Sequence, residues 1–203
     1  DASFLWTNTL DMPSADHVVV VRYVTPTLVK DIRSGPLGAF NREDYSVVSY
    51  TTPASIDSTL FVAANDGVHG MELWKSDGTE AGTMLVKDIW PGVDSAFPWS
   101  ESMTWFSQTF VNVDGTMFFV ARDGVHNYEV WKSDGTAAGT VMVKDIYNSW
   151  DEIPANLTNV NGTLFFSHTD GIHGVELWKS NGTAAGTVMV KDINPGANGS
   201  NPD

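Results

Sequence analysis

Three histidines occupy one repeated position, three residues before the glutamate of a Glu-(Leu/Val)-Trp-Lys sequence: His69, His126 and His173. Three imidazoles gathered around one axis could bind a transition metal through neutral ring nitrogens, ~2.0–2.1 Å from a zinc ion. The alternative is that each histidine tightens its own turn through a hydrogen bond. Because nothing in the sequence fixes the geometry of the three rings, we expect the turn role and no metal.

Aromatic residues cluster in two long connectors between these motifs. One connector carries Tyr45, and the other carries four further candidates for a ligand site: Trp90, Phe97, Trp99 and Trp105. Exposed aromatic rings among acidic and hydroxyl side chains suit the apolar faces and hydroxyls of carbohydrate. The same rings could instead fill gaps in the core, and the sequence leaves both interpretations open.

Asp-Gly pairs at 66–67, 123–124 and 170–171 invite a calcium interpretation. They lack the spaced acidic ladder that supplies the six to eight oxygens of a calcium loop. Turn formation explains them, although the surplus of acid still allows weak calcium binding. We therefore expect no cofactor.

Four asparagines head Asn-x-Ser/Thr triplets: Asn156, Asn161, Asn181 and Asn198. Such a triplet is a glycosylation acceptor in a host that performs the modification. Aspartate holds the corresponding turn positions in other repeats, so tolerance of positive φ is a sufficient reason for Asn161 and Asn181.

Catalytic patterns give little support for an enzyme. There is no cysteine, no nucleophile elbow, no phosphate loop and no His-Glu-x-x-His sequence. Carboxylate pairs such as Asp151 and Glu152 fall in loops, where solvation explains them. We expect a protein that is not an enzyme.

Composition narrows the classes of partner. The 203 residues are 42% apolar and carry a formal net charge of −14, which allows one globular core and disfavours contact with nucleic acid or anionic lipid. No apolar run approaches the ~18 residues of a membrane span, so we expect no membrane insertion.

The candidate residues belong to a repeated unit of Glu-(Leu/Val)-Trp-Lys-Ser-(Asp/Asn)-Gly-Thr, which begins at Glu72, Glu129 and Glu176. A Lys-Asp-Ile sequence follows each tryptophan by thirteen residues, and a fourth stands at 30–32. In the last unit, turn residues separate runs of β-branched and aromatic residues at 157–160, 163–168, 175–179 and 187–193, which predicts four short antiparallel strands. The repeated tryptophans Trp74, Trp131 and Trp178 are expected in the core, with stacking on sugar rings as the alternative.

Such a unit must stack on its neighbours, because its fourth strand is apolar on nearly every position. Four units predict one all-β domain over residues 1–203, a four-bladed β-propeller with repeats at about 1–32, 47–89, 109–146 and 157–193, the first degenerate. Residues 194–203 look like a connector that leads into a further strand, as Ser3–Trp6 could supply. Joined within one molecule, these ends close a ring; joined between molecules, they form a polymer.

The motif Glu-Leu-Trp-x-x-Asp-Gly-Thr, followed by Ala-Gly-Thr and Val-Lys-Asp-Ile, resembles the bacterial ELWxxDGT repeat family over residues 60–193. The resemblance implies tandem β-repeats of secreted or surface-attached proteins, and it implies no catalytic residue. We expect an extracellular, non-catalytic binding or adhesion module with a glycan or cell-surface polymer as partner. The alternatives are a subunit of a fibre that assembles head to tail, and the propeller domain of a polysaccharide-degrading enzyme.

Overall fold

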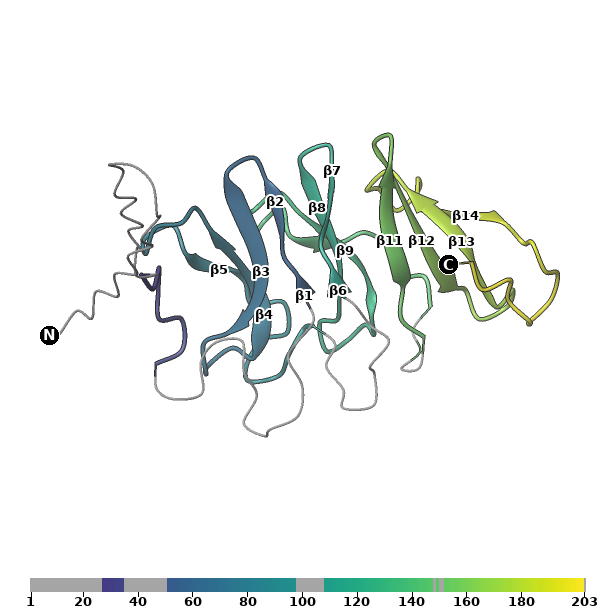
Figure 1. Cartoon of the computed structure of the whole chain (residues 1–203). Helices are drawn as coiled ribbons and strands as arrows, with labels where there is room; N and C mark the ends of the chain where they lie inside the picture. The colour runs from purple at the N-terminus through teal and green to yellow at the C-terminus, as the bar shows by residue number, and fades with distance from the viewer. Residues whose placement is uncertain (1–26, 35–50, 98–107, 148, 150–151, 203) are drawn as a thin grey trace, which may run out of the picture.

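The computed structural model describes residues 27–34, 51–97, 108–147, 149 and 152–202. These residues form strands, turns and loops without a helix (Figure 1). The fourteen strands are β1 (Thr51–Thr52), β2 (Ala54–Ile56), β3 (Thr59–Asn65), β4 (Met71–Ser76), β5 (Met84–Lys87), β6 (Gln108–Thr109), β7 (Val111–Val113), β8 (Thr116–Ala121), β9 (Glu129–Ser133), β10 (Val141–Met142), β11 (Ala155–Val160), β12 (Thr163–Thr169), β13 (Val175–Ser180) and β14 (Val188–Lys191).

Each of the three motifs lies in a four-stranded antiparallel sheet. The strand orders are β2-β3-β4-β5, β7-β8-β9-β10 and β11-β12-β13-β14, so every sheet is a simple meander. The predicted strands of the last unit match β11 to β14 within a few residues, and the four-strand unit is confirmed for these three repeats.

Tight turns between the first two strands of a sheet follow from local sequence. Asn161 and Gly162 have φ angles of 50° and 79°, and Asp114 and Gly115 have 49° and 81°. Two consecutive positive φ angles are what a two-residue hairpin of type I′ requires. The predicted Asn-Gly hairpin is thus confirmed.

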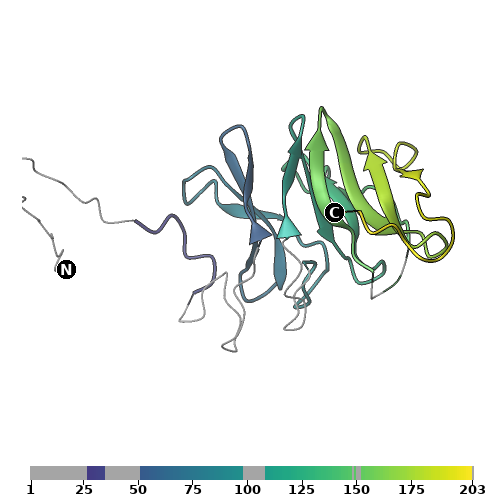
Figure 2. The same ribbon diagram turned by 45° about the vertical axis from the view of Figure 1, so that its right-hand side comes forward.

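The three sheets stand in a row, with residues 27–34 at one end and β14 at the other (Figures 1 and 2). In the described part of the chain the sheets do not close into a ring. A parallel pair, β1 with β6, joins the segments that enter the first and second sheets. Apart from residues 27–32, the predicted degenerate first repeat (1–32) lies outside the described residues, as does the predicted Ser3–Trp6 strand.

The core lies between neighbouring sheets. One buried cluster combines Phe61 and Leu73 of the first sheet with Phe119 and Trp131 of the second, and a second cluster joins the second and third sheets. Trp74, Trp131 and Trp178 are only 5–6% exposed. The prediction of core tryptophans is confirmed, and the sugar-platform alternative is wrong for these three.

The last sheet departs from the prediction that every fourth strand is covered on both faces. Val86 and Val143, in or beside the fourth strands of the first two sheets, are 7% and 6% exposed, but the equivalent Val190 in β14 is 45% exposed. The physical reason is position, since no described sheet follows β14 in the row.

Among the described residues no helix has the length and apolar character of a membrane span.

Candidate functional site: a repeat-to-repeat docking face

All seven lysines of the chain stand at two motif positions, after the motif tryptophan or before Asp-Ile. Five of them donate a hydrogen bond to a backbone carbonyl of the next sheet: Lys30, Lys75, Lys87, Lys132 and Lys144. These lysines therefore bind each repeat to the one that follows it.

The lysine after the motif tryptophan donates a hydrogen bond to a glycine carbonyl. Lys75 Nζ donates to the carbonyl oxygen of Gly135 at 2.8 Å, and Lys132 Nζ donates to that of Gly182 at 2.7 Å. Both acceptors belong to the Ser-(Asp/Asn)-Gly-Thr turn of the next repeat. The contact repeats with the period of the motif, which explains why the motif holds a lysine at this place.

The lysine of Lys-Asp-Ile donates a hydrogen bond to a threonine carbonyl, also in the repeat that follows. Lys87 Nζ lies 2.7 Å from the carbonyl oxygen of Thr140, and Lys144 Nζ lies 2.9 Å from that of Thr187. Each ammonium also lies over the next motif tryptophan, with Lys87 5.8 Å from the ring centre of Trp131. Charge-assisted hydrogen bonding and cation–π attraction thus act together between sheets.

The acceptor carbonyls are held in place by a hydrogen-bonded turn. In the second repeat Asp134 Oδ1 accepts from both the backbone N–H and the hydroxyl of Thr136. Thr140 Oγ1 donates to the carbonyl of Thr136 and pairs with Ser133 Oγ at 2.8 Å. The same network recurs in the first and third repeats. The motif residues Ser, Asp or Asn, and Thr therefore build the surface that the preceding lysines recognise.

The motif glutamate binds the segment that follows the fourth strand of its sheet through backbone N–H groups. This role was not predicted from the sequence. Glu72 is fully buried, and its carboxylate accepts the backbone N–H groups of Ile89 and Ala96 at 2.7 and 3.1 Å. Burial raises the pKa of Glu72 to about 8 because desolvation disfavours the charged form. The recurring spacing of glutamate and Lys-Asp-Ile was the signal that could have pointed to this contact.

The last glutamate differs electrostatically from the first two. Burial raises the pKa of Glu129 to about 7. At Glu176 a hydrogen bond from the Ser200 hydroxyl, together with backbone donors, lowers the pKa below its ordinary value. Ser200 lies in the 194–202 segment, whose Asn201 N–H also donates to the Val175 carbonyl at 3.1 Å. This segment folds back on its own sheet as residues 90–96 do on the first.

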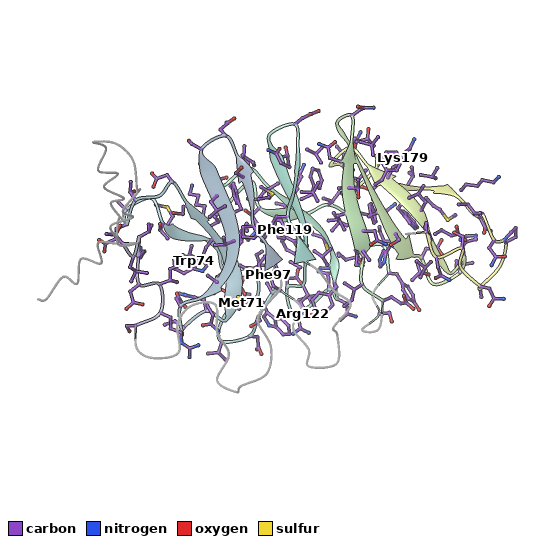
Figure 3. All side chains as sticks on the ribbon, viewed as in Figure 1. Met71, Trp74, Phe97, Phe119, Arg122 and Lys179 are labelled. Atoms are coloured by element: carbon purple, nitrogen blue, oxygen red, sulfur yellow. The ribbon has the colours of Figure 1, made fainter. Side chains whose placement is uncertain are left out.

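The two remaining lysines, Lys179 and Lys191, stand on the last sheet. Both are exposed, and neither forms a hydrogen bond or ion pair with a described residue. Figure 3 shows Lys179 on the last sheet, whereas Phe97 and Phe119 lie between the first two. Ile193 is 53% exposed, against 3% for the equivalent Ile89. We name the surface formed by Phe165, Leu177, Lys179, Val190, Lys191 and Ile193 the terminal face.

Family models, curated protein sequences and solved structures all give no match to this chain.

The three repeated histidines are not brought together. Each ring Nδ1 pairs with the aspartate of its own turn, as His69 does with Asp66 at 2.7 Å and His126 with Asp123 at 3.0 Å. This hydrogen bond raises the pKa of each imidazole. His173 and Asp170 repeat the arrangement. No group of three or more potential metal ligands occurs among the described residues, and the same aspartates, predicted as turn formers, serve that role here.

The predicted aromatic ligand site is only partly described. Phe97 is 1% exposed and packs against Phe110 and Phe119 at centroid distances of 5.7 and 5.6 Å, so its assignment to a surface site is wrong. Trp90 is half-buried and has the Arg122 guanidinium 4.4 Å from its ring centre. A Cβ at Gly124 would lie 2.6 Å from Trp90 Nε1, so the ring of Trp90, which follows the first sheet, packs against the second repeat. Tyr45, Trp99 and Trp105 lie outside the described residues.

A polar cavity of about 550 Å³ lies where the third sheet meets the 194–202 segment. The residues that line it include Tyr147, Glu152 and Asn198. Most small-molecule pockets are lined mainly by apolar side chains. This polar lining with one aromatic residue instead suits a polar ligand such as a sugar, whose apolar face can lie on an aromatic ring. Sequence reasoning did not single out these three residues for binding.

Proposed function

We propose that this chain is a non-catalytic structural module of an extracellular repeat array, in which each sheet binds the next through two lysines. The observation that carries the proposal is the pairing of five lysines with carbonyls of the following repeat, while the two lysines of the last sheet stay exposed. The resemblance to ELWxxDGT repeats supports the extracellular location, which surface labelling of intact producing cells would test.

The terminal face would serve both a four-bladed ring and an open array. The open array has the better support, because residues 27–34 and β14 lie at opposite ends of the row. In such an array stability is approximately a sum of repeat and interface contributions, so an added repeat of the right type stabilises its neighbour.

The proposal can be tested by adding a repeat. A fusion that appends a second copy of residues 153–202 after residue 203 should raise the melting temperature of the host, because the appended turn supplies the two carbonyl acceptors. The matched control carries Lys179→Met and Lys191→Met in the host part only, which should reduce the gain. An appended repeat that leaves the melting temperature unchanged and is removed rapidly by protease would contradict the proposal.

A second candidate function, glycan binding, has support from the polar cavity beside Tyr147. The exposed Asn198 is the useful probe, because its hydrogen bond with a described residue uses the backbone carbonyl and leaves the side chain uninvolved. Asn198→Ala should weaken binding on a glycan array while leaving the melting temperature unchanged. If no glycan binds to the unaltered chain at millimolar concentration, this candidate is withdrawn.

A further inference from the structure

The two ends of the row of sheets carry complementary halves of one repeated contact. Inside the row, the contact joins the lysine after the motif tryptophan to the glycine carbonyl of the next turn. The last sheet has the lysine, Lys179, with no described sheet beyond it. The first sheet has the turn, with Gly78 at the glycine position.

The acceptor half is open at Gly78. Gly135 and Gly182 are buried, whereas Gly78 is exposed. A Cβ built on Gly135 would lie 3.2 Å from the Phe61 ring, and one on Gly182 would lie 3.1 Å from the Phe118 ring. No described residue comes within 4 Å of the corresponding point at Gly78.

The donor half is open on the terminal face. Phe61 and Phe118 are 2% and 3% exposed because each lies under the glycine of the next repeat. Their equivalent, Phe165, is more exposed than either and lies beside Lys179, its partner in the β12–β13 register. The side chains that would cover Gly78 are therefore displayed together on the last sheet.

We propose that two copies of this chain associate head to tail, with Lys179 of one copy donating to the Gly78 carbonyl of the next and Phe165 packing over that glycine. The inference rests on the proposed function. The contact is heterologous, because it joins two different surfaces, so it propagates into filaments unless it closes.

Two features set the conditions for this association. The Thr83 carbonyl already accepts Lys30 at 2.7 Å, so Lys191 of an arriving copy must displace Lys30 or remain unpaired. Each copy carries a formal charge of −14, and the resulting repulsion is weakened by salt. Association should therefore increase with ionic strength, unlike an interaction that depends on long-range attraction.

Sedimentation velocity of two variants, alone and mixed, tests the proposal. Lys179→Met removes the donor at an exposed site. Gly78→Asn places a side chain where Phe165 would pack. This variant should fold, because asparagine tolerates positive φ and the exposed Gly78 has no described residue within 4 Å of an added Cβ. The unaltered chain should form species larger than dimers as concentration rises, each variant alone should remain monomeric, and an equimolar mixture should stop at dimers.

A charge-matched control separates this contact from general repulsion. Ala137→Glu also makes the chain one unit more negative, at an exposed position where the first repeat has the exposed Glu80. It should assemble like the unaltered chain. Monomers of the unaltered chain at every concentration and salt level would overturn the proposal, as would unchanged assembly of either variant. If the chain stays monomeric while an appended copy of residues 153–202 still raises the melting temperature, a second copy of this chain is not the partner of the terminal face. The proposed function would still stand in that case.

Discussion

Lys132 Nζ donates to the carbonyl oxygen of Gly182 at 2.7 Å, across fifty residues of sequence and one interface between sheets. The same atom pair joins Lys75 to Gly135 in the preceding interface. A charged donor on a carbonyl that a turn network holds rigid gives the interface a fixed register. The relationship also identifies what the last sheet lacks, because Lys179 has no described acceptor.

Replacing the motif glycine by asparagine should destabilise the domain at Gly135 but leave its stability almost unchanged at Gly78. Gly135→Asn forces the Phe61 ring to move, since a Cβ there would lie 3.2 Å from the ring. Overpacking of this kind costs ~1–3 kcal/mol. At Gly78 no described residue lies within 4 Å of an added Cβ, so Gly78→Asn should change the unfolding free energy by less than ~0.5 kcal/mol. Urea unfolding of the two variants checks the contrast, and equal losses would contradict it.

Phe97→Ala should destabilise the domain by ~3–5 kcal/mol, because a fully buried ring would leave a cavity. Thermal unfolding followed by circular dichroism provides the measurement. Glycan binding, if present at the cavity beside Tyr147, should be retained by the folded fraction. A stable variant that has lost glycan binding would restore Phe97 to the ligand site.

Glu129→Gln should flatten the pH dependence of stability. The ordinary pKa of 4.5 rises to about 7 on folding, so between these values the unfolded chain has released a proton that the folded chain keeps. Stability should therefore fall as pH rises from 4.5 to 7, by an amount on the order of 3 kcal/mol. The variant should show less of this fall in urea midpoints measured at pH 5 and pH 8.

The geometry around Glu129 makes glutamine a suitable replacement. Oε1 accepts the backbone N–H groups of Ile146 and Tyr147, both at 2.9 Å, and Oε2 makes no hydrogen bond. Oε2 lies 3.8 Å from His168 Nε2, and burial lowers the pKa of His168 to about 4, so this histidine is neutral over the range. The charges of Asp145 and His126 also act on Glu129. An unchanged slope in the variant would assign the dependence to another group.

The sequence predicted the strands of each unit because hairpin residues such as Asn161 and Gly162 determine local conformation without help from distant segments. It also predicted the core tryptophans, since a large apolar residue at a fixed strand position in every repeat needs cover. The closed ring could not be read in this way, because closure depends on the rotation between sheets, which no local pattern encodes. Phe97 was misassigned because a loop residue in sequence can still lie between two sheets in space.

The roles of the lysines and glutamates were missed for a related reason. A lysine in an exposed strand pattern is ordinarily solvated, so Lys75 and Lys132 gave no sign of their carbonyl acceptors. Only the register between sheets reveals that partner. The repetition itself was the available signal, since all seven lysines occupy just two motif positions.

Lysine donors join each sheet to the next, and a comparison of two paired double variants measures how much they contribute. Lys132→Met with Lys144→Met removes two hydrogen bonds to carbonyls of the third sheet, each contributing ~1.5–3 kcal/mol. Lys179→Met with Lys191→Met makes the same change in charge on the terminal face. At a concentration where the chain is monomeric, urea unfolding should show a clear loss for the first pair and almost none for the second. Equal losses from the two pairs would show that Lys132 and Lys144 do not stabilise the interface between the sheets.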